Sequence, residues 1–324
     1  KINSGILLYT DSDTEELYQG AIVGFSDSLS LVENCNVNMN CNILNGGTIV
    51  GVNRNSTIRN CAYSSKSIVL ISLNGGGIAM HNICDSNYAD AIIENCYFYG
   101  KIIGSYSVKN IGGIVCFNKT IDNDNNKKAI IRNCHVKLLD DIWGFDDFAT
   151  VVANNSSKSV VEYCYADLSK MIEHNAKLFS TNEGEATNCT NYTINDYGCT
   201  LAENISIGNN NSNLLIEVLN LWIPEQENPF IYKTWKISNN SIPEFDKMYN
   251  VIENDELSDE ITIYPNPVSQ TLKIEGTDIL KVKIYDISGR LINTYYNNCN
   301  EINVNNYPDG AYLLNIITNK GKSH

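Results

Sequence analysis

The stretch LVENC at residues 31–35 is the first copy of a short phrase that recurs along the N-terminal part of the chain. Further copies are TIRNC at 57–61, IIENC at 92–96 and IIRNC at 130–134, followed by the diverged copies VVEYC at 160–164 and ATNC at 186–189. Successive cysteines of these copies are 26, 35, 38, 30 and 25 residues apart, which is typical of stacked structural repeats. The phrase therefore predicts a region of six similar units.

A second phrase, a glycine followed by apolar residues, lies between the copies of the first. It reads GAIVG at 20–24, GTIVG at 47–51, GIAM at 77–80 and GIVC at 113–116, with TVVA at 150–153 and KLFS at 177–180 as weaker copies. The third and fourth units are longer than the others, which indicates loops inserted on one side of a stack.

The residues around each cysteine predict which side chains face inward. The position three before the cysteine is β-branched in Val32, Ile58, Ile93, Ile131 and Val161, and the position two after it is apolar in Val37, Tyr63, Phe98, Val136 and Ala166. A straight strand cannot bury two side chains that are an odd number of residues apart on one face. Asn adopts the left-handed conformation more readily than other residues except glycine. We therefore expect a bend at each Asn, with a hydrogen-bonded ladder of Asn34, Asn60, Asn95, Asn133 and Asn188.

The position two before each cysteine alternates in charge. It holds Glu33, Arg59, Glu94, Arg132 and Glu162 in successive units. Opposite charges on neighbouring strands contribute roughly 0.2–1 kcal/mol per pair. This alternation predicts that the units stack in parallel with these side chains outward, as in a parallel β-helix (a solenoid) over residues 1–208.

The cysteines of the phrase have two interpretations. We call Cys35, Cys61, Cys96, Cys134, Cys164 and Cys189 the cysteine column. The column could bind a metal or form disulfides between units, because neighbouring strands lie within the Cα separation that a disulfide requires. Alternatively, it is a stack of small buried thiols in the core, and we favour this reading. No CxxC pair occurs, and we predict neither a metal nor a cofactor.

Residues 209–248 predict a small cap of a helix and a hairpin. Apolar residues at helical spacing within 213–223 are Leu215, Val218, Leu219 and Trp222, with Ser212 or Asn211 available as the N-cap. The runs TWKI at 234–237 and IPEF at 242–245 predict the hairpin. We expect this segment to cover the last apolar face of the stack. Trp222 and Trp235 could be sugar platforms, but we favour anchoring in the core.

The C-terminal part carries three further motifs. They are YPNP at 264–267, KIYDISGRLI at 283–292 and YPDGAYLL at 307–314. Short alternating strands with turns between them predict a small Ig-like β-sandwich over residues 261–324. The acidic residues 249–260 before it predict a solvated linker.

Two parts of this chain resemble known families. The GGxIVGxN and IxNC phrases resemble the GLUG-type repeats of bacterial surface proteins, whose fold is a right-handed, pectate-lyase-like β-helix; the LNxW, TWKI and PxF pattern of the cap resembles the segment that closes such proteins. The three C-terminal motifs resemble the type A C-terminal sorting domain of type IX secretion (the Por system) in Bacteroidota. The motif residues are Tyr264, Pro265, Asn266, Pro267, Asp286, Gly289, Arg290, Asp309, Gly310 and Tyr312. That domain normally continues through one more basic strand, so we expect a truncated sorting domain here.

The resemblance implies export through the type IX secretion machinery to the outer-membrane cell surface or the extracellular space. Such cargo usually loses its sorting domain and is anchored to surface lipopolysaccharide or released. The sequence begins at Lys1 without an initiator Met or a signal peptide, so we expect a processed or excerpted chain. A net charge of -14 disfavours nucleic acid and anionic lipid as partners. No stretch approaches the ~18 apolar residues of a membrane span.

A catalytic site has weak candidates. Parallel β-helices often host pectin lyases and glycosidases, which need clustered carboxylates. The run DDIWGFDD at 140–147 offers Asp140, Asp141, Asp146 and Asp147, with Trp143 as a ligand platform. The run DNDNN at 122–126 lacks the Gly and Glu of a calcium loop. We expect a non-enzymatic adhesin-like or structural surface protein with a glycan or host protein as ligand. The alternatives are a polysaccharide lyase or glycoside hydrolase, and a binding module of a longer secreted protein.

Overall fold

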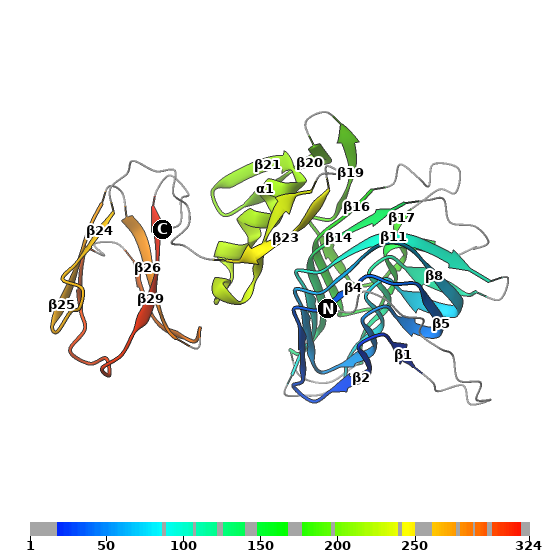
Figure 1. Cartoon of the computed structure of the whole chain (residues 1–324), viewed down its shortest axis with the longest axis horizontal. Helices are drawn as coiled ribbons and strands as arrows, with labels where there is room; N and C mark the ends of the chain where they lie inside the picture. The colour runs from blue at the N-terminus through cyan, green and yellow to red at the C-terminus, as the bar shows by residue number, and fades with distance from the viewer. Residues whose placement is uncertain are drawn as a thin grey trace. The chain divides into compact units, whose positions relative to one another are not determined.

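The computed structural model of the chain describes residues 18–85, 89–105, 108–121, 126–139, 148–167, 177–195, 198–238, 242–249, 261–276, 279–287, 289–296 and 300–318. The described elements are mostly β-strands, with one short α-helix (Figure 1). They form two compact bodies. The repeat body comprises residues 1–205, 212–219 and 235–245, and the C-terminal body comprises residues 206–211, 220–234 and 246–324.

One sheet of 21 described strands, β1–β21, contains the repeats, and nearly all of the described strand pairs are parallel. The bounds are β1 Gln19–Gly20, β2 Val23–Asp27, β3 Leu31–Glu33, β4 Asn36–Val37, β5 Cys41–Gly47, β6 Val50–Arg54, β7 Thr57–Arg59, β8 Ala62–Gly76, β9 Ala79–Cys84, β10 Ala91–Glu94, β11 Tyr97–Gly104, β12 Asn110–Gly112, β13 Val115–Thr120, β14 Ala129–Leu138, β15 Phe148–Asn155, β16 Val160–Asp167, β17 Lys177–Asn182, β18 Glu185–Thr187, β19 Thr190–Asn195, β20 Gly198–Ile207 and β21 Asn210–Leu214.

Each copy of the Asn-Cys phrase pairs with the next copy in the same register. The strand before the bend aligns Val32, Ile58, Ile93, Ile131, Val161 and Ala186 in that order. The register is kept at these positions although the units differ in length, and shifts of register within β8 against β5 and β11 take up part of the difference. The predicted parallel pairing of the repeats is confirmed.

The main core of the repeat body is filled from the positions that the sequence marks as inward. The residues three before the cysteine, the cysteines and the residues two after it belong to one hydrophobic cluster. Tyr63 and Phe98 stack within this cluster with ring centroids 5.0 Å apart. Burial of such columns supplies the main stabilisation of the sheet.

The glycine phrase aligns differently from the sequence-based prediction. Gly47 pairs with Gly76, and Gly76 with Gly112, whereas the predicted alignment used the following glycines of the third and fourth units. A methyl group on Gly47, Gly76 or Gly112 would collide with the carbonyl oxygen three residues later. The backbone therefore approaches itself closely at this position, and the glycine doublets of the sequence hide which glycine makes that approach.

A helix and a hairpin follow the repeats. The segment contains α1 Leu215–Trp222, the 3-10 turns Ile223–Glu225 and Pro229–Ile231, and strands β22 Lys233–Ile237 and β23 Pro243–Met248. The apolar face predicted for α1 is buried. The helix begins two residues later than predicted because β21 continues to Leu214. Ser212 is therefore not the N-cap, and its Oγ instead accepts a hydrogen bond from the backbone N of Leu214, at 3.0 Å.

Hydrogen bonds join this segment to the third and fourth units of the repeat body. The Trp235 Nε1 donates to the Asn95 Oδ1 at 2.9 Å, and the Asn133 Nδ2 donates to the carbonyl oxygen of Leu219 at 3.3 Å. That the segment covers the last apolar face of the stack stays a prediction. At the last unit the sheet changes from parallel to antiparallel pairing, between β19 and β20.

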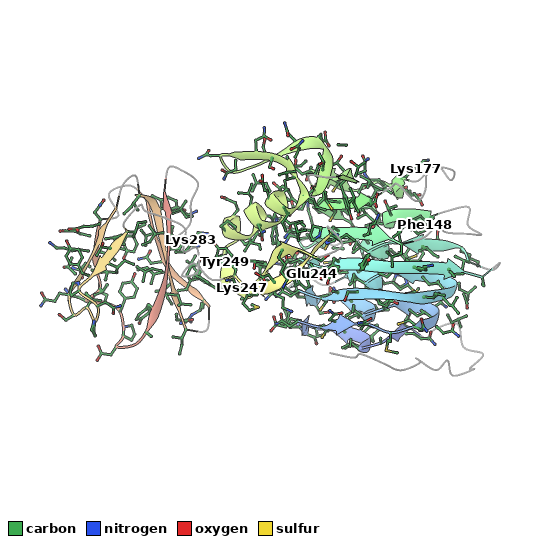
Figure 2. All side chains as sticks on the ribbon, turned by 45° about the horizontal axis from the view of Figure 1, so that its top comes forward. Phe148, Lys177, Glu244, Lys247, Tyr249 and Lys283 are labelled. Carbon is green, nitrogen blue, oxygen red and sulfur yellow. The ribbon has the colours of Figure 1, made fainter. Side chains whose placement is uncertain are left out.

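The described C-terminal body holds two three-stranded antiparallel sheets, ordered β24-β25-β28 and β27-β26-β29. The bounds are β24 Thr262–Tyr264, β25 Thr271–Glu275, β26 Ile279–Asp286, β27 Leu291–Tyr296, β28 Glu301–Asn303 and β29 Tyr312–Thr318. Both sheets contribute to one apolar core. Within this body, Lys283 of β26 (labelled in Figure 2) donates to the carbonyl oxygen of Gln226 at 3.0 Å. Most of the predicted acidic linker lies outside the described residues.

We predict that Gly76→Ala lowers the stability of the repeat body by about 1–3 kcal/mol, because the new methyl group would overlap backbone atoms that cannot move without breaking the sheet register. The midpoint of denaturant unfolding measures this loss. Gly310→Ala is the control, because the nearest atom to its added methyl carbon is 4.0 Å away. Equal midpoints for the two variants would contradict the prediction.

Candidate functional sites

The Asn of each repeat adopts the left-handed conformation. The φ angles are 59° at Asn34, 52° at Asn60, 50° at Asn95, 50° at Asn133 and 52° at Asn188, and Tyr163 at the same position of the fifth unit has a φ of 51°. This conformation is uncommon for bulky side chains, which makes Tyr163 the exceptional member. The bend lets both the β-branched residue before it and the cysteine after it face the core.

The side chains of these Asn residues form a ladder in the middle units. The Asn95 Nδ2 donates to the Asn60 Oδ1 at 2.7 Å, and the Asn133 Nδ2 donates to the Asn95 Oδ1 at 2.8 Å. All three side chains are buried. A buried amide without a partner would cost about 1–3 kcal/mol, and these two hydrogen bonds remove that cost for the groups that they join.

Two further amide ladders were not predicted from the sequence. The longer one runs through Asn53, Asn82, Asn118, Asn155 and Asn182, with successive Nδ2 to Oδ1 distances of 2.7, 2.9, 2.8 and 2.8 Å. The shorter one joins Asn45, Asn74 and Asn110 at 3.2 and 3.1 Å. Each Asn of the longer ladder stands three residues after an aligned apolar residue of the glycine phrase, such as Val50 or Ala79. This constant spacing is the sequence feature from which the longer ladder could have been predicted.

The cysteine column lies on the inner side of the bend. Each Sγ donates to the carbonyl oxygen two residues earlier, as from Cys96 to Glu94 at 3.2 Å and from Cys164 to Glu162 at 3.3 Å. Burial raises the pKa of the Cys96 and Cys164 thiols well above the ordinary value. Because the thiolate is the nucleophile and the metal ligand, Cys96 and Cys164 react slowly while they are buried in the folded chain. In the described part of the chain, no group of three or more His, Cys, Asp or Glu side chains has metal-binding geometry.

The alternating charges form ion pairs across neighbouring strands. Arg59 contacts Glu33 at 3.7 Å and Glu94 at 2.8 Å, and Arg132 contacts Glu94 at 2.7 Å. These residues lie outside the core, as predicted, but the Glu94 side chain is only 2% exposed. A carboxylate buried to this degree needs its two guanidinium partners.

Rings and amides of the third and fourth units are covered by the hairpin. The rings of Tyr97 and His135 stack with centroids 5.3 Å apart, and the Trp235 ring lies 5.2 Å from that of His135. His135 is fully buried, and its Nε2 donates to the carbonyl oxygen of Pro243 at 3.0 Å. Burial lowers the pKa of His135 to about 3. Trp222 and Trp235 are also buried, which excludes them as sugar platforms.

A buried ion pair joins the fourth and fifth units. Lys137 and Asp167 are register partners on β14 and β16, and their side chains form an ion pair although both residues are buried. Each of these two residues stands three residues after a column cysteine. The other units have no charged residue at that position, so no repeating pattern predicted the pair.

The predicted catalytic and ligand candidates lie outside the described residues. This applies to Asp140, Asp141, Trp143, Asp146 and Asp147, and to Asp122 and Asp124 of the calcium-like run. The site assignment for these residues therefore stays a prediction.

The motif residues of the C-terminal body build its turns. Gly289 has a φ of 81°, and the Asp286 carboxylate accepts hydrogen bonds from the backbone N and the Nε of Arg290, each at 3.1 Å. The Tyr312 hydroxyl donates to the carbonyl oxygen of Pro308 at 2.8 Å, and the Tyr264 hydroxyl donates to the Glu275 carboxylate. Residues 265–267, 309 and 310 are exposed. The motif thus combines turn-forming residues with an accessible surface.

We predict that acidification weakens the repeat body partly through His135. Its folded pKa of about 3 lies below the ordinary 6.5, so the unfolded chain takes up the proton first and stability falls as pH drops below that ordinary value. Between pH 6.5 and 5 this contributes a loss of roughly 2 kcal/mol. Urea unfolding at pH 7.5 and pH 5 should show a smaller loss for His135→Phe, which cannot titrate, than for the unaltered chain. Equal losses would contradict the prediction.

The comparisons with known proteins concern the C-terminal body. Residues 262–324 match the family described as the secretion system C-terminal sorting domain. No curated protein and no solved structure matches the chain significantly. Among the described residues, no helix is long and apolar enough to cross a membrane. The chain therefore carries a sorting domain that directs it through the type IX secretion machinery to the cell surface or beyond.

Proposed function

We propose that residues 1–208 form a right-handed parallel β-helix of GLUG-like repeats, and that this β-helix is the exported passenger. In this proposal the protein is a non-enzymatic, adhesin-like or structural component of the cell surface. The observation that carries the proposal is the constant parallel register of successive units around the left-handed bends. A bend at the same point of every unit, with the cysteine and its neighbours inside, is what a β-helix needs at each corner.

The use of the recurrent polar residues supports a scaffold rather than a catalyst. The amides of the longer ladder bond to one another, and Glu94 is held between Arg59 and Arg132. His135 donates to a backbone carbonyl under the hairpin. A catalytic site needs polar groups that converge on a substrate and are accessible to it. In the described units these groups instead bind one another.

The resemblance to type IX cargo suggests how the passenger reaches its place of action. The sorting domain would be removed after export, and the β-helix anchored to surface lipopolysaccharide or released. Its ligand would then be a glycan or a host protein, presented to the exposed faces of the repeat units.

Deletion of residues 262–324 should abolish delivery. We predict that the full chain, expressed behind a periplasmic signal peptide in a bacterium with type IX secretion, becomes accessible to protease on whole cells or appears in the medium. The deleted chain should accumulate in the periplasm, because the sorting domain is the part that the machinery recognises. Delivery of the deleted chain at the level of the full chain would contradict the prediction.

The proposed activity is tested on the purified chain with immobilised glycans and matrix proteins, followed by an assay for polysaccharide cleavage. The proposal expects saturable binding without new reducing or unsaturated sugar ends. Release of such ends by the unaltered chain, and its loss on changing Asp140, Asp141, Asp146 and Asp147 to Ala, would overturn it in favour of a lyase or glycoside hydrolase.

A further inference from the structure

The register of the repeat sheet aligns the cysteine column from unit to unit. Cys134 and Cys164 are direct register partners, and the strands on either side of Cys35 and Cys61 pair in register. The backbone N of Cys61 donates to the Cys96 Sγ at 3.4 Å, and the Cys189 Sγ donates to the carbonyl oxygen of Val161, three residues before Cys164, at 3.5 Å. The register therefore places successive column cysteines next to one another.

The spacing of the column permits a disulfide between neighbours and excludes one between more distant members. Paired strands lie about 4.8 Å apart, within the Cα separation of roughly 4.4–6.8 Å that a disulfide requires. Second neighbours stand at twice the strand spacing and are out of reach. A column of six cysteines has only one complete pairing of neighbours.

Export gives these thiols an oxidising environment. The sorting domain directs the chain through the type IX machinery, which takes its cargo from the periplasm, and disulfides form and persist there. The inference rests on this export and on the observed register, and does not depend on the proposed adhesive role.

We propose that the exported chain closes the column into three disulfides, Cys35–Cys61, Cys96–Cys134 and Cys164–Cys189, each joining one repeat unit to the next. For each bond, two thiols lose two protons and two electrons and one S–S bond forms. The electrons pass to a disulfide-bearing thiol oxidase of the periplasm, whose own disulfide is reduced to a dithiol. The three bonds would join the units as 1–2, 3–4 and 5–6.

Access to the column differs along its length. Cys35 and Cys189 at its ends are half-buried, whereas Cys61, Cys96, Cys134 and Cys164 have no exposed surface. Burial also raises the pKa of Cys96, so little of its reactive thiolate is present in the folded chain. The Cys96–Cys134 disulfide therefore forms before the units have stacked. The other two disulfides, each of which includes a half-buried cysteine, can also form in the folded chain.

The pairing is tested by mass mapping of chain recovered after export. The sample is acid-quenched, alkylated in denaturant without reductant, digested and analysed. We expect three linked peptides with the stated pairs, and alkylation of the off-column residues Cys41 and Cys116. Alkylation of all six column cysteines would overturn the proposal, as would a pairing that joins Cys61 to Cys96.

Variants and a stability measurement give a second test. Cys61→Ser should leave Cys35 as the only alkylated member of the column, with the other two pairs intact. The matched control Cys116→Ser, which removes a buried cysteine off the column, should leave all three pairs. Reductant should lower the thermal midpoint of the exported chain by at least about 5 °C. An unchanged midpoint would overturn the proposal even if a variant fails to fold.

Discussion

The left-handed bend at the Asn of each repeat is the constraint on which the repeat body depends. A straight strand would place the β-branched residue and the cysteine on opposite faces, and one of them would point to solvent. With φ near 50° at Asn95 and Asn133, the β-branched residue and the cysteine of the same unit both face the core. The charged residue that follows the β-branched residue faces outward. The fifth unit makes the same bend with Tyr163. The surrounding register therefore imposes the conformation even where the side chain does not favour it.

Stacking of the units supplies hydrogen-bond and ion-pair partners to polar groups that are buried in each unit. A buried amide or a buried Glu94 would destabilise an isolated unit, because its polar groups would lack partners. In the stack, the unit before and the unit after supply those partners, through the ladder of Asn60, Asn95 and Asn133 and through the two arginines. The stability of a unit thus depends on its interfaces with the neighbouring units, as in other repeat proteins.

The sequence allowed prediction of those features that repeat with a fixed offset from a marker residue. The bends, the inward columns, the charge alternation and the motifs of the sorting domain all belong to this class. The glycine alignment could not be predicted, because doublets at Gly46–Gly47 and Gly112–Gly113 leave two registers that only the backbone contacts distinguish. The packing of the hairpin was also missed, since an apolar face shows that Trp235 is buried but not against which unit. The longer amide ladder was missed because a lone Asn after an apolar run is equally typical of a turn.

The same residues explain why polar clusters in a repeat sequence are weak evidence for catalysis. His135, Glu94 and the column cysteines would each rank as candidates in an ordinary enzyme. Here the His135 ring is covered by Trp235 and donates to the carbonyl oxygen of Pro243, Glu94 is paired with Arg59 and Arg132, and burial suppresses the thiolates of Cys96 and Cys164. A residue that recurs in every unit is therefore explained first by its contacts with the neighbouring units. Candidates for ligand contact are therefore better sought among residues that break the repeat, and the sequence run at 140–147, which has no counterpart in the compact first unit, is of that kind.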